Sequence, residues 1–332
     1  MEGTITLLEA LVSSIPSPTP AWQSFKVGPF TIHYYALLIL LGIILAAWWT
    51  HARLTKRGGE PGVTLDVVLW TVPLGIIFAR AYHVVTHPHD YFAAGDNLVN
   101  VFYIWDGGNA IFGALIGGAL GLWLACVTPR RHKLRFMSFA DALVPGLLLA
   151  QSIGRLGNYV NNELFGLPTK LPWGLQIPTT NKAYPAGLPA HTVFHPLFLY
   201  EIVWNVLGII VLLLIERKWK PRWGIFFGMY LIWYGAGRSY LESIRIDPSE
   251  FGFLGIPSNV WAAFGAVVLG IVIIAVQSRR HHGAEPSVYR RGYEWTPDGD
   301  DVDSQQPELT EDIPGDLAPS DETSAEAKAT SR

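Results

Sequence analysis

The sequence contains 332 residues, of which 50% are apolar and 15% are charged, whereas soluble domains carry about 25% charged residues. Residues 283–332 hold 13 of the 27 acidic residues and four basic ones, so the rest of the chain is basic on balance. This composition excludes a soluble globular enzyme and a chain disordered throughout, and it predicts a membrane protein with an acidic tail. The single cysteine, Cys126, excludes a disulfide framework, and the small net charge of −3 gives no indication of nucleic-acid binding.

Seven apolar stretches follow one another along the chain, and a transmembrane helix needs about 20 mostly apolar residues. They cover residues 34–50, 63–85, 107–127, 138–154, 197–215, 224–241 and 251–278. A single stretch of this kind is also typical of a buried helix in a soluble protein. Seven in one chain instead predict an all-α polytopic membrane protein with seven transmembrane helices.

The basic residues of the short loops predict the orientation of these spans. Lysine and arginine gather in loops 51–62, 128–137 and 216–223 and after the last span, whereas loop 86–105 contains none. Cytoplasmic loops carry an excess of these residues. We therefore expect the N-terminus and the long loop 155–196 outside and the C-terminus in the cytoplasm.

Three parts follow from this topology. Residues 1–30 are an extracytoplasmic N-terminal segment, which lacks the early basic residues of a cleavable signal peptide. Residues 31–280 are the seven-span transmembrane domain. Residues 281–332 are expected to be a disordered cytoplasmic tail, because they are acidic, rich in proline and serine and poor in apolar residues.

One polar segment, residues 154–166, follows the fourth span at the outer face of the membrane. It contains Arg155, Gly157, Asn158, Asn161, Glu163 and Gly166. Glycines let the backbone approach a ligand closely, and the planar fork of an arginine suits a phosphate. The alternative is a loop cap in which Arg155 merely pairs with Glu163, and the residues alone leave both interpretations open.

A second polar group closes the sixth span, where a charged side chain costs about 2.5–3.5 kcal/mol in the membrane. Arg238, Glu242 and Arg245 are spaced to lie on one face of a helix. They could form a structural ion-pair ladder, or they could bind an anionic lipid headgroup. Arg80 and Asp141 are further ionisable residues within predicted spans.

These segments resemble the bacterial prolipoprotein diacylglyceryl transferase family over about residues 25–280. The resemblance rests on the signature 154–166, on the motifs WDGG (105–108), HPLFLYE (195–201) and YGAGRSYLESIR (234–245), and on His33-Tyr34-Tyr35. It implies a transferase that moves a diacylglyceryl group from phosphatidylglycerol to the lipobox cysteine thiol of a preprolipoprotein, with release of glycerol phosphate. It also implies the bacterial plasma membrane as the location.

The resemblance carries functional roles to individual residues. It implies catalytic roles for Arg155, Arg238, Tyr35, Glu163 and Glu242, and headgroup binding for Arg155, Asn158, Gly166, Arg238 and Gly113. From chemistry and position we add Gly157, Asn161 and Arg80 as candidate headgroup-binding residues. The sequence departs from the family at Phe112, where a proposed basic histidine is expected, and phenylalanine cannot take a proton.

We expect no cofactor and no metal ion, because no histidine or cysteine spacing is typical of a ligand set and no glycine-rich nucleotide loop occurs. The expected partners are phosphatidylglycerol, preprolipoprotein signal peptides and membrane lipids, with no nucleic acid, and we expect a monomer. A lipid or solute transporter, with Arg80, Asp141 and Arg238 lining its path, is the alternative function. The sequence shows no internal repeat of the kind that transporters often carry.

Overall fold

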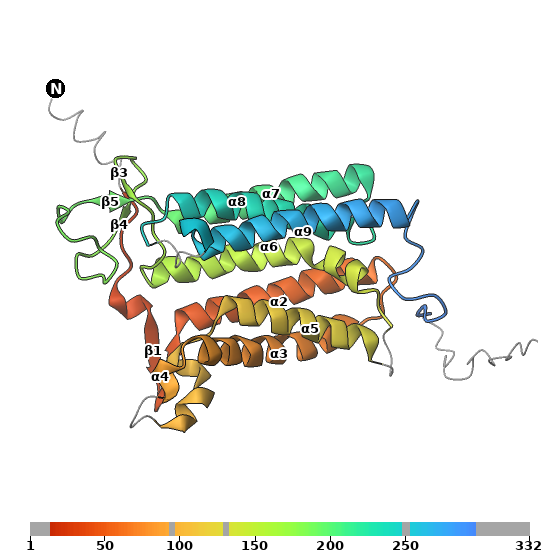
Figure 1. Cartoon of the computed structure of the whole chain (residues 1–332), viewed down its shortest axis with the longest axis horizontal. Helices are drawn as coiled ribbons and strands as arrows, with labels where there is room; N and C mark the ends of the chain where they lie inside the picture. The colour runs from red at the N-terminus through yellow and green to blue at the C-terminus, as the bar shows by residue number, and fades with distance from the viewer. Residues whose placement is uncertain (1–13, 93–96, 129–132, 248–252, 297–332) are drawn as a thin grey trace, which may run out of the picture. The chain divides into compact units, whose positions relative to one another are not determined.

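The computed structural model describes residues 14–92, 97–128, 133–247 and 253–296. The chain divides into two compact units, Met1–Trp295 and Thr296–Arg332, and all described helices and strands belong to the first. Within the described residues, seven long helices make up most of this unit (Figure 1). They are α2 (Tyr34–Thr55), α3 (Val63–Thr86), α5 (Ile111–Val127), α6 (Phe136–Val160), α7 (Leu197–Trp219), α8 (Ile225–Ser243) and α9 (Ser258–Arg280).

Each predicted span overlaps with one of these helices. In the described part of the chain, five of them, α2, α3, α6, α7 and α9, are long and apolar enough to cross a membrane. Helix α5 is apolar but has 17 residues, and α8 is less apolar because it contains Arg238 and Glu242. Large apolar side chains such as Leu40, Ile44 and Leu214 are more than half exposed, as is expected where lipid surrounds a helix. The structure thus supports an all-α, multi-pass membrane protein.

The remaining elements are short and lie mainly in the loops. They are η1 (Pro20–Trp22), β1 (Ser24–Val27), β2 (Phe30–His33), α4 (His89–Phe92), η2 (Leu98–Phe102), η3 (Ile104–Asp106), β3 (Pro168–Thr169), β4 (Leu175–Gln176), β5 (Val193–Phe194) and η4 (Phe253–Gly255). Strands β1 and β2, which come directly before α2 in the sequence, form an antiparallel hairpin. Strands β3, β5 and β4 form a small antiparallel sheet. The buried rings of Phe165 and Phe194 form the core of that sheet.

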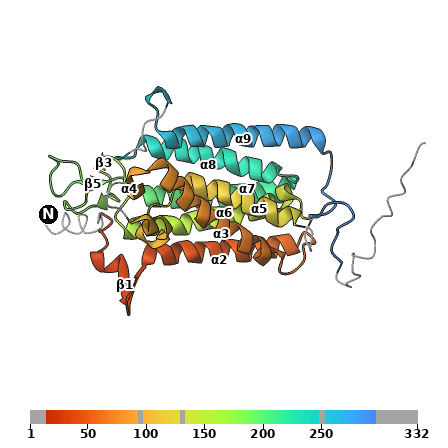
Figure 2. The same ribbon diagram turned by 60° about the horizontal axis from the view of Figure 1, so that its bottom comes forward.

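Helix α6 runs through the middle of the bundle, with α2 on one side and α7, α8 and α9 on the other (Figures 1 and 2). It approaches α2 closely, because a Cβ at Gly146 would lie 2.8 Å from the carbonyl oxygen of Ala46. The carboxylate of Asp141 is fully buried in α6 and accepts hydrogen bonds of 2.8 Å from the backbone N–H groups of Gly224 and Phe227. Asp141 therefore caps the beginning of α8 rather than facing an open path.

Helices α3 and α5 pack against each other through a stripe of small residues on α5. A Cβ at Gly113 would lie 2.6 Å from the Cβ of Tyr82 and closer still to the carbonyl of Phe78, and Gly117 and Gly121 meet α3 in the same way. Close backbone approach through small residues is a common means of helix association in membranes. The structure therefore shows a packing role for Gly113.

An apolar cavity of about 360 Å³ separates the α3–α5 pair from α2 and α6. Its wall includes Ile43, Val67, Leu122, Phe139 and Ala150. Three of these wall residues, Val67, Leu122 and Phe139, also belong to the buried cluster that includes Tyr289. The cavity therefore ends at that cluster.

Residues 283–295, which composition assigns to the disordered tail, instead lie against the ends of the helices in the structure. Val288 and Tyr289 are 1% exposed, and the Tyr289 hydroxyl accepts a 2.8 Å hydrogen bond from the backbone N–H of Glu60. The backbone N–H of Arg135 donates to the carbonyl of Val288 at 2.8 Å. Burial raises the pKa of Tyr289 above its ordinary value. The rest of the expected tail, residues 297–332, lies outside the described residues, as do residues 1–13 of the N-terminal segment.

Candidate active site

Arg155 lies in the last turns of α6 and reaches across to α7. Its Nη2 lies 2.6 Å from Oε1 of Glu201, and its Nη1 donates to Oδ1 of Asn158 at 2.9 Å. The two side chains of the ion pair are only 23% and 11% exposed. A guanidinium held at two of its nitrogens by a carboxylate and an amide has a defined orientation, and its planar fork suits a phosphate.

Glu163 contacts Arg155 indirectly, through an amide. The Nδ2 of Asn158 donates to Oε1 of Glu163 at 2.9 Å, and Asn161 reaches the same oxygen at 3.4 Å. The pairing of Arg155 with Glu163 that the sequence left open is thus replaced by Arg155 with Glu201. Glu163 is exposed and Asn158 is buried, so the carboxylate lies at the rim and the amide in the interior.

Tyr35 lies in the first turn of α2 and packs against the signature segment. A Cβ at Gly157 would collide with the ring of Tyr35, so only glycine allows this contact between α2 and α6. Tyr35 is also within electrostatic reach of Glu163 and Arg155. The role of Gly157 that the structure shows is to admit the tyrosine ring beside Arg155.

Gly166 joins the signature segment to the two other motifs. Its N–H donates to the carbonyl of His195 at 2.9 Å, and the N–H of Leu167 donates to the carbonyl of Ile244 at 2.9 Å. A Cβ at Gly166 would lie 2.7 Å from the Cβ of His195 and 2.8 Å from the carbonyl oxygen of Ile244. The close approach of three backbone segments therefore requires glycine at this position.

Arg238 forms the second ion pair, near the end of α8. Its Nη2 lies 2.8 Å from Oε2 of Glu242, whose side chain is fully buried, and Arg245 approaches the same oxygen at 3.4 Å. The Nδ2 of Asn259 donates to the other oxygen of Glu242 at 3.2 Å. The predicted ladder of Arg238, Glu242 and Arg245 is therefore formed, with one carboxylate between two guanidinium groups.

Tyr234, which was not among the predicted site residues, lies near the two ion pairs. The charged groups of both ion pairs, Arg155 with Glu201 and Arg238 with Glu242, contribute to the electrostatic environment of its hydroxyl. The signal in the sequence was its spacing, because Tyr234 lies one helical turn before Arg238 on the same face of α8. Glu201 was named only as the last residue of the motif HPLFLYE (195–201), with no partner assigned to it.

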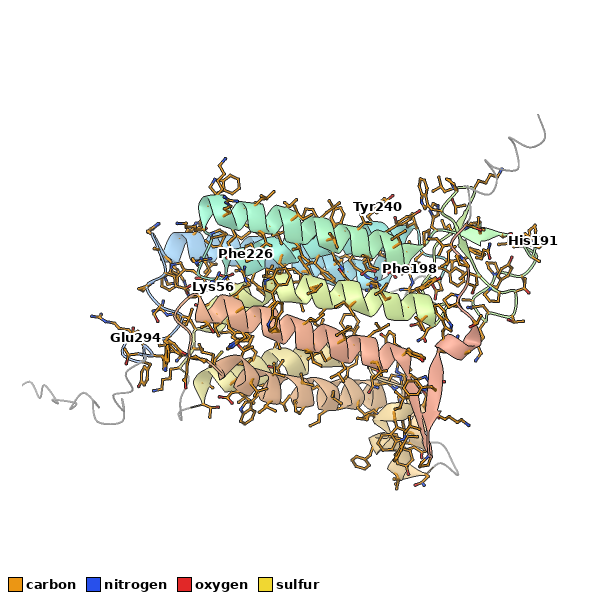
Figure 3. The ribbon with its side chains drawn as sticks, turned by 180° about the vertical axis from the view of Figure 1, so that it is seen from behind. Lys56, His191, Phe198, Phe226, Tyr240 and Glu294 are labelled. Carbon is orange, nitrogen blue, oxygen red and sulfur yellow. The ribbon has the colours of Figure 1, made fainter. Side chains whose placement is uncertain are left out.

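These groups gather at the end of the bundle that also carries the small β-sheet. Phe198 and Tyr240, which neighbour Glu201 and Glu242 in the sequence, lie at that end, whereas Lys56 and Glu294 lie at the other end (Figure 3). At the far end, one oxygen of Glu216 accepts hydrogen bonds from Arg53, Arg57 and Arg222 at 2.9–3.2 Å.

Arg80 lies apart from the two ion pairs, in the second half of α3. Its guanidinium donates to the backbone carbonyls of Asn100, Val101, Gly107 and Gly108 at 2.5–3.1 Å, and it is 7% exposed. Arg80 therefore stabilises the conformation of the loop that contains the WDGG motif. A polar cavity of about 490 Å³ lies beside it, lined also by His83, Asp90 and Tyr91.

Phe112 and Cys126 have apolar surroundings. The ring of Phe112 lies 6.3 Å from the ring of Tyr82, at the contact of α3 and α5. The Cys126 thiol is buried in the cluster that includes Leu54 and Tyr289. Among the described residues, no three histidine, cysteine or acidic side chains are grouped in a way that could hold a metal ion.

Comparison with known proteins shows the family to which this chain belongs. The family model for prolipoprotein diacylglyceryl transferase matches residues 23–276, which include both ion pairs. The chain belongs to this family. A phosphatidylglycerol–prolipoprotein diacylglyceryl transferase from Leifsonia xyli subsp. xyli is 62% identical over 305 residues, which cover 90% of each chain.

More distant relatives carry the same name. One from Bifidobacterium longum (strain DJO10A) is 42% identical over 287 residues, which cover 83% of this chain and 89% of the relative. The second such enzyme of Streptomyces coelicolor is 41% identical over 269 residues, covering 81% of this chain and 83% of the relative. The match to the family model ends before residues 283–295, although that segment is packed against the helices.

Proposed function

We propose that this chain transfers the diacylglyceryl group of phosphatidylglycerol to the lipobox cysteine thiol of a preprolipoprotein, the first step of bacterial lipoprotein maturation. The names of its relatives state the lipid donor and the prolipoprotein acceptor. The observation that carries the proposal is the pair of arginines, Arg155 and Arg238, each held by a carboxylate.

The reaction requires stabilisation of negative charge on two groups, the attacking sulfur and the departing phosphate. A thiolate sulfur attacks C3 of the diacylglyceryl group, forming a C–S bond, while the bond from C3 to the phosphate oxygen breaks. Its electron pair leaves with glycerol phosphate, and the thiol proton is released. The nucleophile is the thiolate, so a site that favours negative charge on both sulfur and phosphate accelerates the step.

Arg155 and Arg238 supply that positive charge. Their guanidinium groups bind the phosphate and stabilise its developing charge, and their field favours the thiolate. Glu201 and Glu242 hold the two guanidinium groups in place through the ion pairs at 2.6 and 2.8 Å. Asn158, with Asn161 and Glu163 beside it, orients Arg155, and Tyr35 and Gly166 complete the wall of the site.

The apolar cavity suits the acyl part of the donor. It extends along α6 as far as Ala150, which lies about one and a half turns before Arg155. A phospholipid whose phosphate lies at Arg155 would therefore have its acyl chains at the depth of this cavity. We assign Arg80 and Gly113 to the support of the surrounding fold rather than to headgroup binding.

The topology proposed from the sequence suits this chemistry. All seven long helices cross the plasma membrane, with the N-terminus outside and residues 297–332 in the cytoplasm. The cluster of Arg53, Arg57 and Arg222 then lies at the cytoplasmic side, where an excess of basic residues is expected. Arg155 and Arg238 lie at the outer side, where a translocated signal peptide presents its cysteine, and the chain acts as a monomer.

The test uses the purified full chain in vesicles with phosphatidylglycerol and a peptide that contains an apolar segment and a lipobox cysteine. We expect the peptide to gain the mass of one diacylglyceryl group, with one glycerol phosphate released per modified peptide. A peptide with serine in place of the cysteine should stay unmodified, and so should the cysteine peptide with phosphatidylcholine as the only lipid. An unmodified cysteine peptide under conditions in which the chain is folded would contradict the proposed function.

A further inference from the structure

Two buried amide atoms in the middle of the bundle have no hydrogen-bond partner among the described residues. They are Oε1 of Gln151 in α6 and Nδ2 of Asn205 in α7. Asn205 is 3% exposed. Burying an unpaired amide atom is costly, so such atoms in a folded protein call for an explanation.

The two amides lie at the same depth. Helices α6 and α7 run in opposite directions, because Arg155 near the end of α6 meets Glu201 near the beginning of α7. Gln151 precedes Arg155 by one helical turn, and Asn205 follows Glu201 by one turn, so both lie one turn further into the membrane than the ion pair. The buried face of α7 consists of Leu197, Glu201, Asn205, Gly208 and Leu212. Glu201 and Asn205 therefore share one face, and the antiparallel packing of α6 and α7 leads us to expect Gln151 opposite Asn205.

The nitrogen of the Gln151 amide connects α6 to α8. Its Nε2 donates to the hydroxyl of Tyr230 at 2.8 Å, and the ring of Tyr230 lies 6.1 Å from the ring of Tyr234. If the amide is turned over, the Tyr230 hydroxyl donates to the oxygen and the nitrogen becomes the unpaired atom. In either orientation, one polar atom of Gln151 remains for Asn205, whose own amide can also turn to match it.

We propose that Gln151 and Asn205 are positioning residues for Arg155. Their amides are bridged by one water molecule, which holds α6 against α7 one turn inside the ion pair. This contact fixes the spacing of the two helices and so keeps the Arg155 guanidinium against Glu201 and toward the phosphate. The inference rests on the proposed transferase function, and it adds two residues that act through Arg155 without touching the substrate.

A double-mutant cycle between Asn205 and Arg155 tests this coupling. Asn205→Leu removes the amide at similar volume and should lower kcat about 5-fold with little change in KM, as expected for one lost hydrogen bond. In an Arg155→Lys background, the same change should lower kcat less than about 2-fold, because the guanidinium that it positions is already absent. Asn205→Ser, which keeps a hydrogen-bonding group, should recover most of the loss.

A second double-mutant cycle combines Gln151→Met with Arg155→Lys, so the test does not depend on the folding of one variant. All rates are measured per folded enzyme. Gln277→Leu, an amide in the last turn of α9, is the matched control and should leave the rate unchanged. Equal losses in the unaltered chain and in the Arg155→Lys background, or normal kcat in both single variants, would overturn the inference. Absence of transfer by the unaltered chain would instead contradict the proposed function.

Discussion

Arg155 and Glu201 lie 2.6 Å apart, Nη2 to Oε1, although they belong to different helices that are separated in the sequence by the whole outer loop. The loop returns the chain to the membrane in such a way that the first turns of α7 face the last turns of α6. The carboxylate nearest to Arg155 in the sequence, Glu163, is instead exposed and contacts it through Asn158. The two carboxylates therefore have different effects on the same guanidinium.

The first prediction compares these two carboxylates. Glu201→Gln removes a largely buried negative charge in direct contact with Arg155, and it should slow transfer by about 10- to 150-fold, the equivalent of one charge-assisted hydrogen bond of about 1.5–3 kcal/mol. Glu163→Gln should slow transfer less than about 5-fold, because an exposed carboxylate that acts through an amide contributes little. The measurement is the transfer rate per folded enzyme. A larger loss for Glu163→Gln would contradict the assignment of Glu201 as the partner of Arg155.

The second prediction separates charge from geometry at the two arginines. Arg155→Lys and Arg238→Lys keep the charge but lose the planar fork that binds a phosphate with two donors. Each should slow transfer by about 10- to 150-fold at unchanged protein abundance. Arg217→Lys, an exposed arginine at the other end of α7, is the control and should retain full activity. Normal rates in both lysine variants would remove these arginines from the active site.

The third prediction uses two glycines of the same helix. A Cβ at Gly157 would collide with the ring of Tyr35, whereas a Cβ at Gly154 would meet no atom within 4 Å. Gly157→Ala should therefore displace Tyr35 and reduce transfer about 10-fold or more, because a small misplacement of groups around a reacting centre is costly. Gly154→Ala should retain activity and stabilise the helix by about 0.5–1 kcal/mol. Equal activity of the two variants would show that the contact with Tyr35 is not needed.

The sequence predicted the helices well because apolar length is a property of consecutive residues. It did not predict the partner of Arg155, because that contact depends on how a long loop returns to the membrane. The partners of Gly113, Phe78 and Tyr82, could not be predicted for a related reason, since a glycine that admits a neighbouring helix and a glycine that admits a ligand look the same in a sequence. The two apolar residues Val288 and Tyr289 are too weak a signal to distinguish a packed segment from an acidic tail.

The fourth prediction concerns the orientation proposed for the seven helices. In a Cys126→Ala background, a cysteine introduced at Asn97 should react with an impermeant thiol reagent added outside intact cells. A cysteine at Ser304 should react only after the membrane is opened, because the basic loops place the C-terminus inside. The reverse labelling pattern would show that the orientation is inverted.

The fifth prediction concerns the segment that packs beyond the family match. A chain that ends at Trp295 keeps Val288 and Tyr289 in the buried cluster, whereas a chain that ends at His282 exposes the side chains they cover. Burying one large apolar side chain contributes about 1.5–3 kcal/mol, so the shorter chain should unfold at a clearly lower temperature and accumulate to a lower level. Tyr289→Ala in the full chain should reproduce part of this loss.

Since the segment lies at the far end of the bundle from Arg155, the enzyme that remains folded should keep its transfer rate. Equal thermal stability of the two truncated chains would show that residues 283–295 contribute nothing to the fold.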